Sequence, residues 1–123
     1  MSIFKEKLVE LNASETYIAN DVILKGDLNI KGTIRIDGTL DGNITNAKQI
    51  TIGKNSNVKG NISCDKCLIS GKIEGNIYAI ESIEILEGSE VNGDLKAPDI
   101  MIEHGAIFNG KCIMEARHKK EEK

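Results

Sequence analysis

The chain has 123 residues, a net charge of −3 and 40% apolar residues. Its length favours a single domain, and the small negative charge gives no global field that would attract nucleic acid. There is no Trp, and there are only two Phe and two Tyr, so a core must be built from Ile, Leu and Val. The sequence shows no secretory h-region and no apolar run of membrane-spanning length, which makes an intracellular location the default expectation.

Residues 1–11 precede the repetitive part of the chain and are predicted to form an N-terminal tail. One interpretation is a disordered start, or a strand that covers the first coil of the following domain. The other is a peripheral membrane anchor, in which Ile3 and Phe4 enter the bilayer surface while Lys5 and Lys7 face anionic headgroups. One such tail binds weakly, but many tails on one polymer bind well through avidity.

Residues 12–114 are predicted to form one domain, because a sixfold repeat fills almost all of them. Its most regular part is a five-residue motif: an apolar residue, any residue, Gly, usually Asn or Asp, and another apolar residue. The repeat glycines are 15 to 18 residues apart: Gly26, Gly42, Gly60, Gly75, Gly93 and Gly110. A repeat of this period is typical of a solenoid.

Each repeat also contains two apolar residues that flank one variable residue, as in Ile34-Arg-Ile36. This spacing predicts a short strand with one buried face, and no segment keeps a helical period. The repeat Gly lies between two inward positions, where it can relieve a bend with positive φ. We therefore expect an all-β solenoid of about six coils of roughly 17 residues, triangular in cross-section, with parallel strands that stack Ile on Ile and Asn on Asn. Residues 115–123 are mostly charged and are predicted to be a solvated tail.

Cys64 and Cys67 form a C-x-x-C pattern, which could indicate a redox pair or half of a zinc site. In the register of the repeat, however, Cys67 occupies the column of Ile50 and Ile83. Cys64 and Cys112 also fall in columns that are otherwise apolar. Cysteine packs as a small hydrophobe, and a second C-x-x-C is absent. We therefore predict three core cysteines and no metal site.

Neither histidine has a discernible catalytic partner, since His104 lies in a turn and His118 in the charged tail. The glycines follow the repeat and match neither a P-loop nor a dinucleotide-binding pattern. The sequence therefore predicts no catalytic residues, no cofactor, no nucleotide and no enzymatic activity.

Phe108 stands in the column before the repeat Gly, which the other five units fill with Leu, Val or Ile. It could close the end of the aliphatic core, or it could form a sticky end that packs against another molecule. Monomeric solenoids cover their terminal strand edges with helices or polar repeats, and neither flank here has an evident cap. Uncapped edges with a terminal aromatic residue predict end-to-end assembly.

Three features together resemble the bactofilins, the bacterial family of polymer-forming cytoskeletal proteins. They are the Gly-Asn/Asp repeat, the terminal Gly105-Ala-Ile-Phe-Asn-Gly110 segment and the short start that carries Phe and Lys. The resemblance implies a right-handed parallel β-helix that polymerises without nucleotide into apolar filaments, through head-to-head and tail-to-tail contacts. It also implies a scaffold at the inner face of the cytoplasmic membrane, with a role in cell shape, polar organisation or motility.

The same resemblance implies functional residues and partners. Phe108 would support polymerisation, with Ile102 and Ile107 beside it in the last repeat. Membrane targeting would fall to the N-terminal residues Ile3, Phe4, Lys5 and Lys7. The implied partners are further copies of the chain, membrane lipid, and cell-wall or motility proteins, but no nucleic acid.

Two other classes of protein remain as alternatives. A left-handed hexapeptide-repeat acyltransferase is suggested by residues 52–63, which read as two hexads. The short gaps from Ile36 to Leu40 and from Ile69 to Ile73 break the six-residue step, and no insertion is present for an acyl-carrier pocket. The second alternative is a monomeric binding module.

Overall fold

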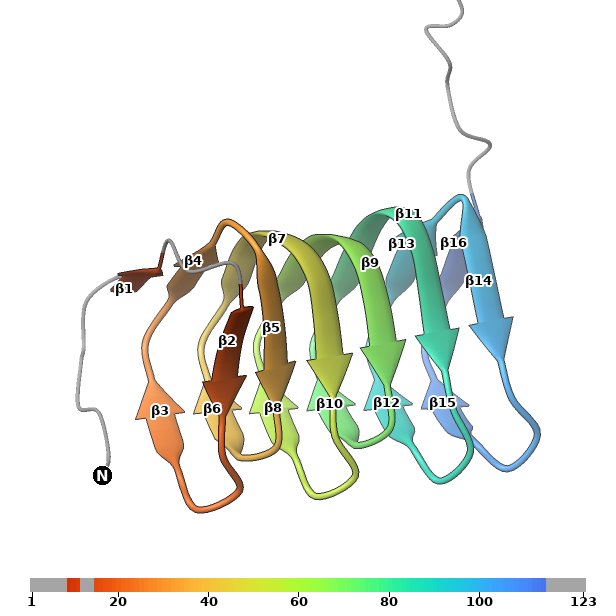
Figure 1. Cartoon of the computed structure of the whole chain (residues 1–123). Coiled ribbons are helices and arrows are strands. Elements are labelled where there is room, and N and C mark those ends of the chain that lie inside the picture. The colour runs from red at the N-terminus through yellow and green to blue at the C-terminus, as the bar shows by residue number, and fades with distance from the viewer. Residues whose placement is uncertain (1–8, 12–14, 115–123) are drawn as a thin grey trace, which may run out of the picture.

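The computed structural model describes residues 9–11 and 15–114, and the chain winds six times around one axis (Figure 1). We number the turns coil 1 (residues 15–30), coil 2 (33–47), coil 3 (49–64), coil 4 (66–79), coil 5 (82–97) and coil 6 (99–114). In Figure 1 the strands nearest the viewer run downward and those behind run upward as the chain advances from left to right, so the path is right-handed. The predicted right-handed β-solenoid of about six coils is confirmed.

Each coil contributes strand segments to three faces. The first face contains β2 (Glu15–Ile18), β5 (Thr33–Ile36), β14 (Asp99–Ile102) and the second halves of β7 (Ile44–Ile52), β9 (Ile62–Ile69) and β11 (Ile77–Ile85). The second face contains β3 (Ile23–Lys25), β6 (Thr39–Asp41), β8 (Asn57–Lys59), β10 (Lys72–Glu74), β12 (Glu90–Asn92) and β15 (Ile107–Asn109). The third face contains β4 (Leu28–Ile30), the first halves of β7, β9 and β11, β13 (Leu95–Ala97) and β16 (Cys112–Met114).

The first and third faces are one continuous sheet, whereas the sequence predicted short strands only. β7, β9 and β11 each pass from the third face to the first without interruption. The register slips beside the bend, between Ile44 and Ala47 and between Ala79 and Ser82. Asn46, at the bend of β7, has a φ of 67°, a conformation that Asn tolerates better than most residues.

Strand β1 (Val9–Leu11) pairs in parallel with β4 at the N-terminal edge of the third face. One interpretation of residues 1–11 was a strand that covers the first coil, and residues 9–11 form such a strand. The last three residues of the predicted tail therefore belong to the sheet. Residues 1–8, 12–14 and 115–123 lie outside the described part of the chain, and no helix in the described part is long and apolar enough to cross a membrane.

The core is a set of aliphatic columns that run the length of the solenoid. Ile34, Ile50 and Ile83 lie in one column and are fully buried, with Cys67 between the last two. Each Ile side chain contacts its equivalents in the coils before and after it. Full burial of such a side chain contributes about 1.5–3 kcal/mol, so stacking of complete coils supplies most of the hydrophobic stabilisation.

The repeat glycines form a column of their own, in which each Gly lies against the carbonyl oxygen of the preceding one. A Cβ at Gly75 would overlap the carbonyl oxygen of Gly60, and a Cβ at Gly93 would overlap that of Gly75. Both Gly75 and Gly93 have a φ of 144°. The column therefore requires Gly for two reasons, the backbone conformation and the close approach of successive coils.

A ladder of side-chain hydrogen bonds runs beside the glycine column. In each step the side-chain oxygen of one Asn or Asp accepts a hydrogen bond from the backbone N–H of its equivalent one coil later. The steps join Asp27 to Asn43 (3.0 Å), Asn43 to Asn61 (2.8 Å), Asn61 to Asn76 (3.1 Å), Asn76 to Asp94 (3.0 Å) and Asp94 to Lys111 (3.2 Å). The ladder satisfies an outward backbone N–H in each of coils 2 to 6 and holds the coils in register.

Candidate functional site

The C-terminal end of the solenoid is open and apolar. In coil 5 the five inward side chains are completely buried, from Ile83 to Ala97. The equivalent side chains of coil 6 are Ile100, Ile102, Phe108, Cys112 and Met114. Ile102 is 40% exposed and Met114 56%, Cys112 is exposed, and Ile100 and Phe108 are half-buried. These side chains continue the inward columns of the core, and in the described chain no further coil covers them.

Phe108 is the aromatic side chain of this open end. It follows Val91 in the inward column of the second face and packs against the core while remaining partly exposed. Ile102 continues the inward column of Ile85 on the first face. Ile107 differs from both, because it follows Glu90 in an outward column and its side chain belongs to the outside of the solenoid. The structure thus places two of the three predicted interface residues on the end and the third at its rim.

The N-terminal end is different. Ile18, Leu24, Leu28 and Ile30 are the apolar inward side chains of coil 1, and all four are buried. The fifth inward position holds Thr16, which is half-buried. Within residues 15–114 the two ends of the solenoid therefore present unlike surfaces, and of these two only the C-terminal end exposes its apolar core columns.

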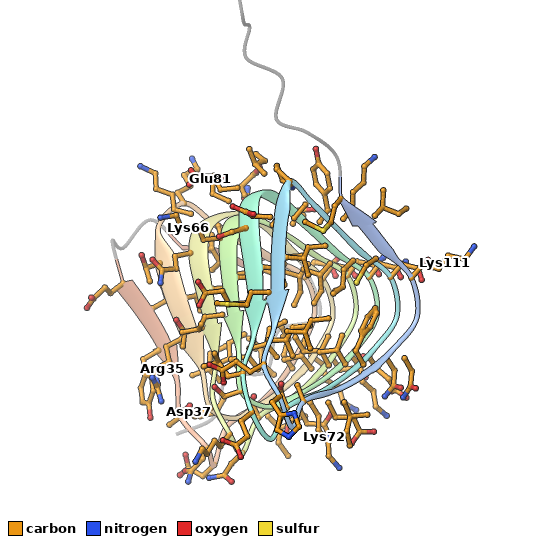
Figure 2. All side chains as sticks on the ribbon, turned by 90° about the vertical axis from the view of Figure 1, so that its right-hand side faces the viewer. Arg35, Asp37, Lys66, Lys72, Glu81 and Lys111 are labelled. Carbon is orange, nitrogen blue, oxygen red and sulfur yellow. The ribbon has the colours of Figure 1, made fainter. Side chains whose placement is uncertain are left out.

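The hydrogen-bond ladder also ends at the C-terminal coil. Lys111 donates its backbone N–H to Asp94, but its own side chain carries no acceptor oxygen. In Figure 2, which looks onto the C-terminal end, the Lys111 side chain points away from the solenoid. The position that would receive the first N–H of an added parallel coil is therefore occupied by a cation.

The cysteines occupy the predicted columns, but the prediction that all three lie in the core is wrong for Cys112. Cys64 and Cys67 are buried, and the hydrogen bond between them together with burial raises the pKa of the Cys67 thiol well above its ordinary value. Cys112 follows Leu95 in an inward column yet is exposed, because coil 6 is the last. No three His, Cys, Asp or Glu side chains gather as a metal site among the described residues.

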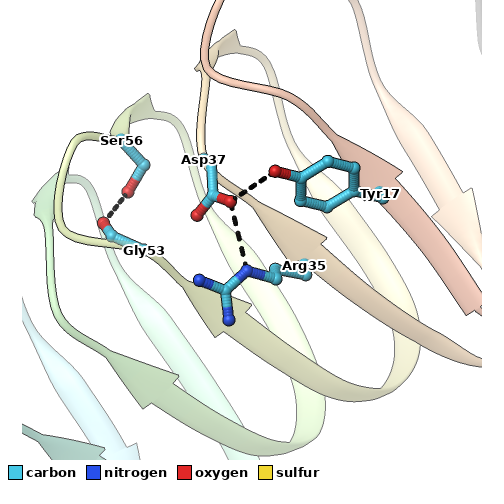
Figure 3. A network of polar contacts seen from close by, with 5 residues as sticks. All are labelled: Tyr17, Arg35, Asp37, Gly53 and Ser56. Carbon is cyan, nitrogen blue, oxygen red and sulfur yellow. Dashed lines mark hydrogen bonds and ion pairs between the residues drawn. The ribbon is translucent and has the colours of Figure 1, made fainter.

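A polar cluster joins coils 1 and 2 on the first face (Figure 3). The Tyr17 hydroxyl donates to Asp37 Oδ2 (2.8 Å), and Arg35 Nε donates to the same oxygen (3.1 Å). Burial raises the pKa of Asp37, but these two hydrogen bonds outweigh it and leave the pKa below its ordinary value. The hydrogen bond to Asp37 raises the pKa of Tyr17. The groups satisfy one another, so the cluster ties adjacent coils together and leaves no base or nucleophile free.

A family model described as bactofilin, polymer-forming cytoskeletal, matches residues 16–113. The chain belongs to the bactofilin family. Comparison with curated proteins and with solved structures returned no match. The matched bactofilin region spans four of the six coils completely and all but the first and last residue of the solenoid.

Family membership makes the chain a polymer-forming cytoskeletal protein with a β-solenoid fold. The family is structural, and polymer formation implies self-association. The hexapeptide acyltransferase alternative is left-handed, whereas this solenoid is right-handed and matches the bactofilins. The predicted membrane-targeting residues, Ile3, Phe4, Lys5 and Lys7, lie outside the described residues.

Sequence reasoning singled out Phe108 but missed the exposure of Ile100, Cys112 and Met114. Each occupies an inward column of the last repeat, so the signal was present once the units were aligned. It was overlooked because an inward column was equated with burial, which holds only where coils follow on both sides.

Proposed function

We propose that this bactofilin assembles end to end, without nucleotide, into filaments that scaffold the inner face of the cytoplasmic membrane. The observation that carries the proposal is the open end of coil 6, where Ile102, Phe108 and Met114 extend the core columns into solvent. A second solenoid end placed against it would bury these side chains at the centre of a contact, where hydrophobic anchors contribute most of the binding energy. Both partners are protein surfaces, so the contact needs no bound nucleotide.

The unlike ends support contacts between like ends and hence an apolar filament. In a head-to-tail contact, the N-terminal coil of one copy would add as a seventh parallel coil on coil 6 of the next. In the added coil the backbone N–H of Asp27 would occupy the next step of the ladder. The side chain opposite it would be Lys111, which has no oxygen to accept a hydrogen bond. A tail-to-tail contact reverses the strand direction across the junction and does not call on this ladder.

Membrane attachment through the N-terminal tail is part of the proposal and rests on the family resemblance of residues 1–8. Ile3 and Phe4 would enter the bilayer surface, and Lys5 and Lys7 would contact anionic lipid, adding roughly 1 kcal/mol for each lysine. A filament presents many tails at once, so weak single attachments combine into stable binding. Such a scaffold would serve cell shape, polar organisation or motility and would recruit cell-wall or motility proteins.

Phe108→Arg tests the end contact. The substitution would bury a charge at the centre of the junction, which costs about 3 kcal/mol or more and weakens assembly about a hundredfold. Sedimentation in nucleotide-free buffer should find the wild type in the pellet and Phe108→Arg in the supernatant. Asn57→Arg is the matched control, because it adds the same charge on an outward position of coil 3, next to Lys72. Filaments of Phe108→Arg with wild-type length would contradict the proposal and favour the alternative that Phe108 only closes the end of the aliphatic core.

A further inference from the structure

The outside of coil 6 carries one large apolar side chain on each of its three faces. On the first face the outward residue changes from Glu84 in coil 5 to Met101 in coil 6. On the second face Glu90 gives way to Ile107, and on the third face Lys96 gives way to Ile113. We call Met101, Ile107 and Ile113 the collar. They are 51%, 54% and 46% exposed, respectively.

The same three columns are polar in coil 3, whereas coil 4 carries Leu68 and Tyr78 in two of them and Lys72 in the third. Coil 3 carries Thr51, Asn57 and Ser63 at the positions of Met101, Ile107 and Ile113. Among the described residues, the other large exposed apolar or aromatic side chains outside coil 6 are Tyr17, Ile23, Tyr78 and Ile80. Tyr17 and Ile23 lie in coil 1, and the Tyr78 ring lies 5.7 Å from the Lys96 ammonium. The change from charged to apolar on all three faces at once is confined to the last coil.

The arrangement of the collar restricts what can cover it. A membrane, or a protein bound along the rod, would contact one face and leave the other two apolar side chains in water. A ring that runs around one end can be covered on all sides only by a body that continues along the axis. Such a body is a second solenoid of the same cross-section, whose outward side chains would stack on the collar as those of neighbouring coils do.

Symmetry explains why the collar is uncharged. In a tail-to-tail contact related by a two-fold axis, one face of each triangular coil meets itself and the other two exchange. At least one outward column would therefore meet its own copy, and charges like those of coil 5 would place Glu against Glu or Lys against Lys. Like charges that face each other across strands are destabilising. Three apolar side chains avoid this repulsion in every such arrangement.

From these observations we propose that the collar of Met101, Ile107 and Ile113 is the rim of a tail-to-tail contact with coil 6 of a second copy of the chain. The proposal deepens the proposed function and rests on its end-to-end assembly. The contact then includes the open core columns and the outward side chains of all three faces. The collar would determine which ends meet and would add to the affinity of the contact.

The test transfers the outside of coil 5 onto coil 6 with the triple variant Met101→Glu, Ile107→Glu, Ile113→Lys. Each new residue is one that its own column already carries in coil 5, so the coil should fold. We expect the critical concentration for sedimentation to rise about tenfold or more, because apolar rim area is lost and like charges meet. The matched control, Thr51→Glu, Asn57→Glu, Ser63→Lys, adds the same groups to the same columns in coil 3 and should leave the critical concentration unchanged.

A charge-free variant separates folding from contact. Met101→Thr, Ile107→Asn, Ile113→Ser copies the outside of coil 3 and should also raise the critical concentration, with unchanged strand content by circular dichroism. A direct readout uses a Cys112→Ser background, in which Ile107→Cys should be shielded from maleimide in filaments while Asn57→Cys reacts freely.

The outcomes are distinguishable. If Phe108→Arg abolishes filaments while both collar variants assemble like the wild type, end-to-end assembly stands and the collar proposal fails. Equal losses in the collar and coil 3 variants would also overturn it, since added charge anywhere would then explain the effect. Collar variants that keep their filaments but lose binding to vesicles of phosphatidylglycerol would assign the collar to lipid instead. A wild type that forms no filaments would remove both proposals.

Discussion

At the scale of single residues, two outward features repeat with the coil and hold it in register. The glycine column lets successive backbones approach closely, and the Asn/Asp ladder supplies an acceptor for one N–H in each of coils 2 to 6. Both depend on the same side-chain type recurring at one place in every unit. A single substitution therefore disturbs the contact with the coil on each side of it.

The glycine column predicts a large difference between two Gly→Ala substitutions. At Gly75 a Cβ would overlap the carbonyl oxygen of Gly60, so we expect Gly75→Ala to lower the free energy of unfolding by about 3 kcal/mol or more. Gly88 also has a positive φ, 85°, but has open space around it, so Gly88→Ala should cost only about 1–2 kcal/mol of backbone strain. Urea unfolding in the Phe108→Arg background measures both without a contribution from the contact at coil 6. Equal losses would mean that close packing at Gly75 is unimportant.

At the scale of elements, what matters is whether another coil follows. β12 and β15 have the same inward pattern, yet Val91 is fully buried and Phe108 is not, because β15 is the last strand of its face. The same difference separates Leu95 from Cys112 on the third face. The open end is therefore a property of position in the stack rather than of local sequence.

Cys112 offers a chemical probe of this end. In the unassembled Phe108→Arg protein, one thiol should react with Ellman's reagent and two should resist, because Cys64 and Cys67 are buried. Partial desolvation of the exposed Cys112 thiol raises its pKa, so near neutral pH it should label more slowly than an ordinary thiol. In wild-type filaments Cys112 should become as unreactive as the other two. A Cys112 that labels equally fast in both states would place the junction elsewhere.

At the scale of the whole molecule, the sequence predicted the solenoid well because every repeat has Ile and Gly at equivalent positions. The inward columns of Ile and the glycine spacing leave little freedom in how the coils stack. The exposure of coil 6 could not be read from one repeat, since burial depends on the neighbouring coil. The sequence did not predict the collar, because the repeat was aligned by its inward columns and the collar lies in outward ones. The family resemblance did name Ile107 as an interface residue. The pairing of β1 was left open because three residues carry too little pattern to predict a strand.

Membrane binding is also a property of the whole assembly. Deleting residues 1–8 should abolish co-sedimentation of filaments with phosphatidylglycerol vesicles while leaving the filaments intact, because the anchor and the end contact use different parts of the chain. Deleting residues 115–123 is the control and should leave lipid binding unchanged. If vesicles still pellet the protein that lacks residues 1–8, the N-terminal tail is not the anchor.

The central claim is that the open end of coil 6 makes this chain a nucleotide-independent polymer. Electron microscopy of the purified wild-type protein, in buffer with EDTA and no nucleotide, tests it most directly. We predict long unbranched filaments for the wild type and separate short rods for Phe108→Arg at the same concentration. Separate short rods from the wild type across a wide range of concentrations would contradict the account.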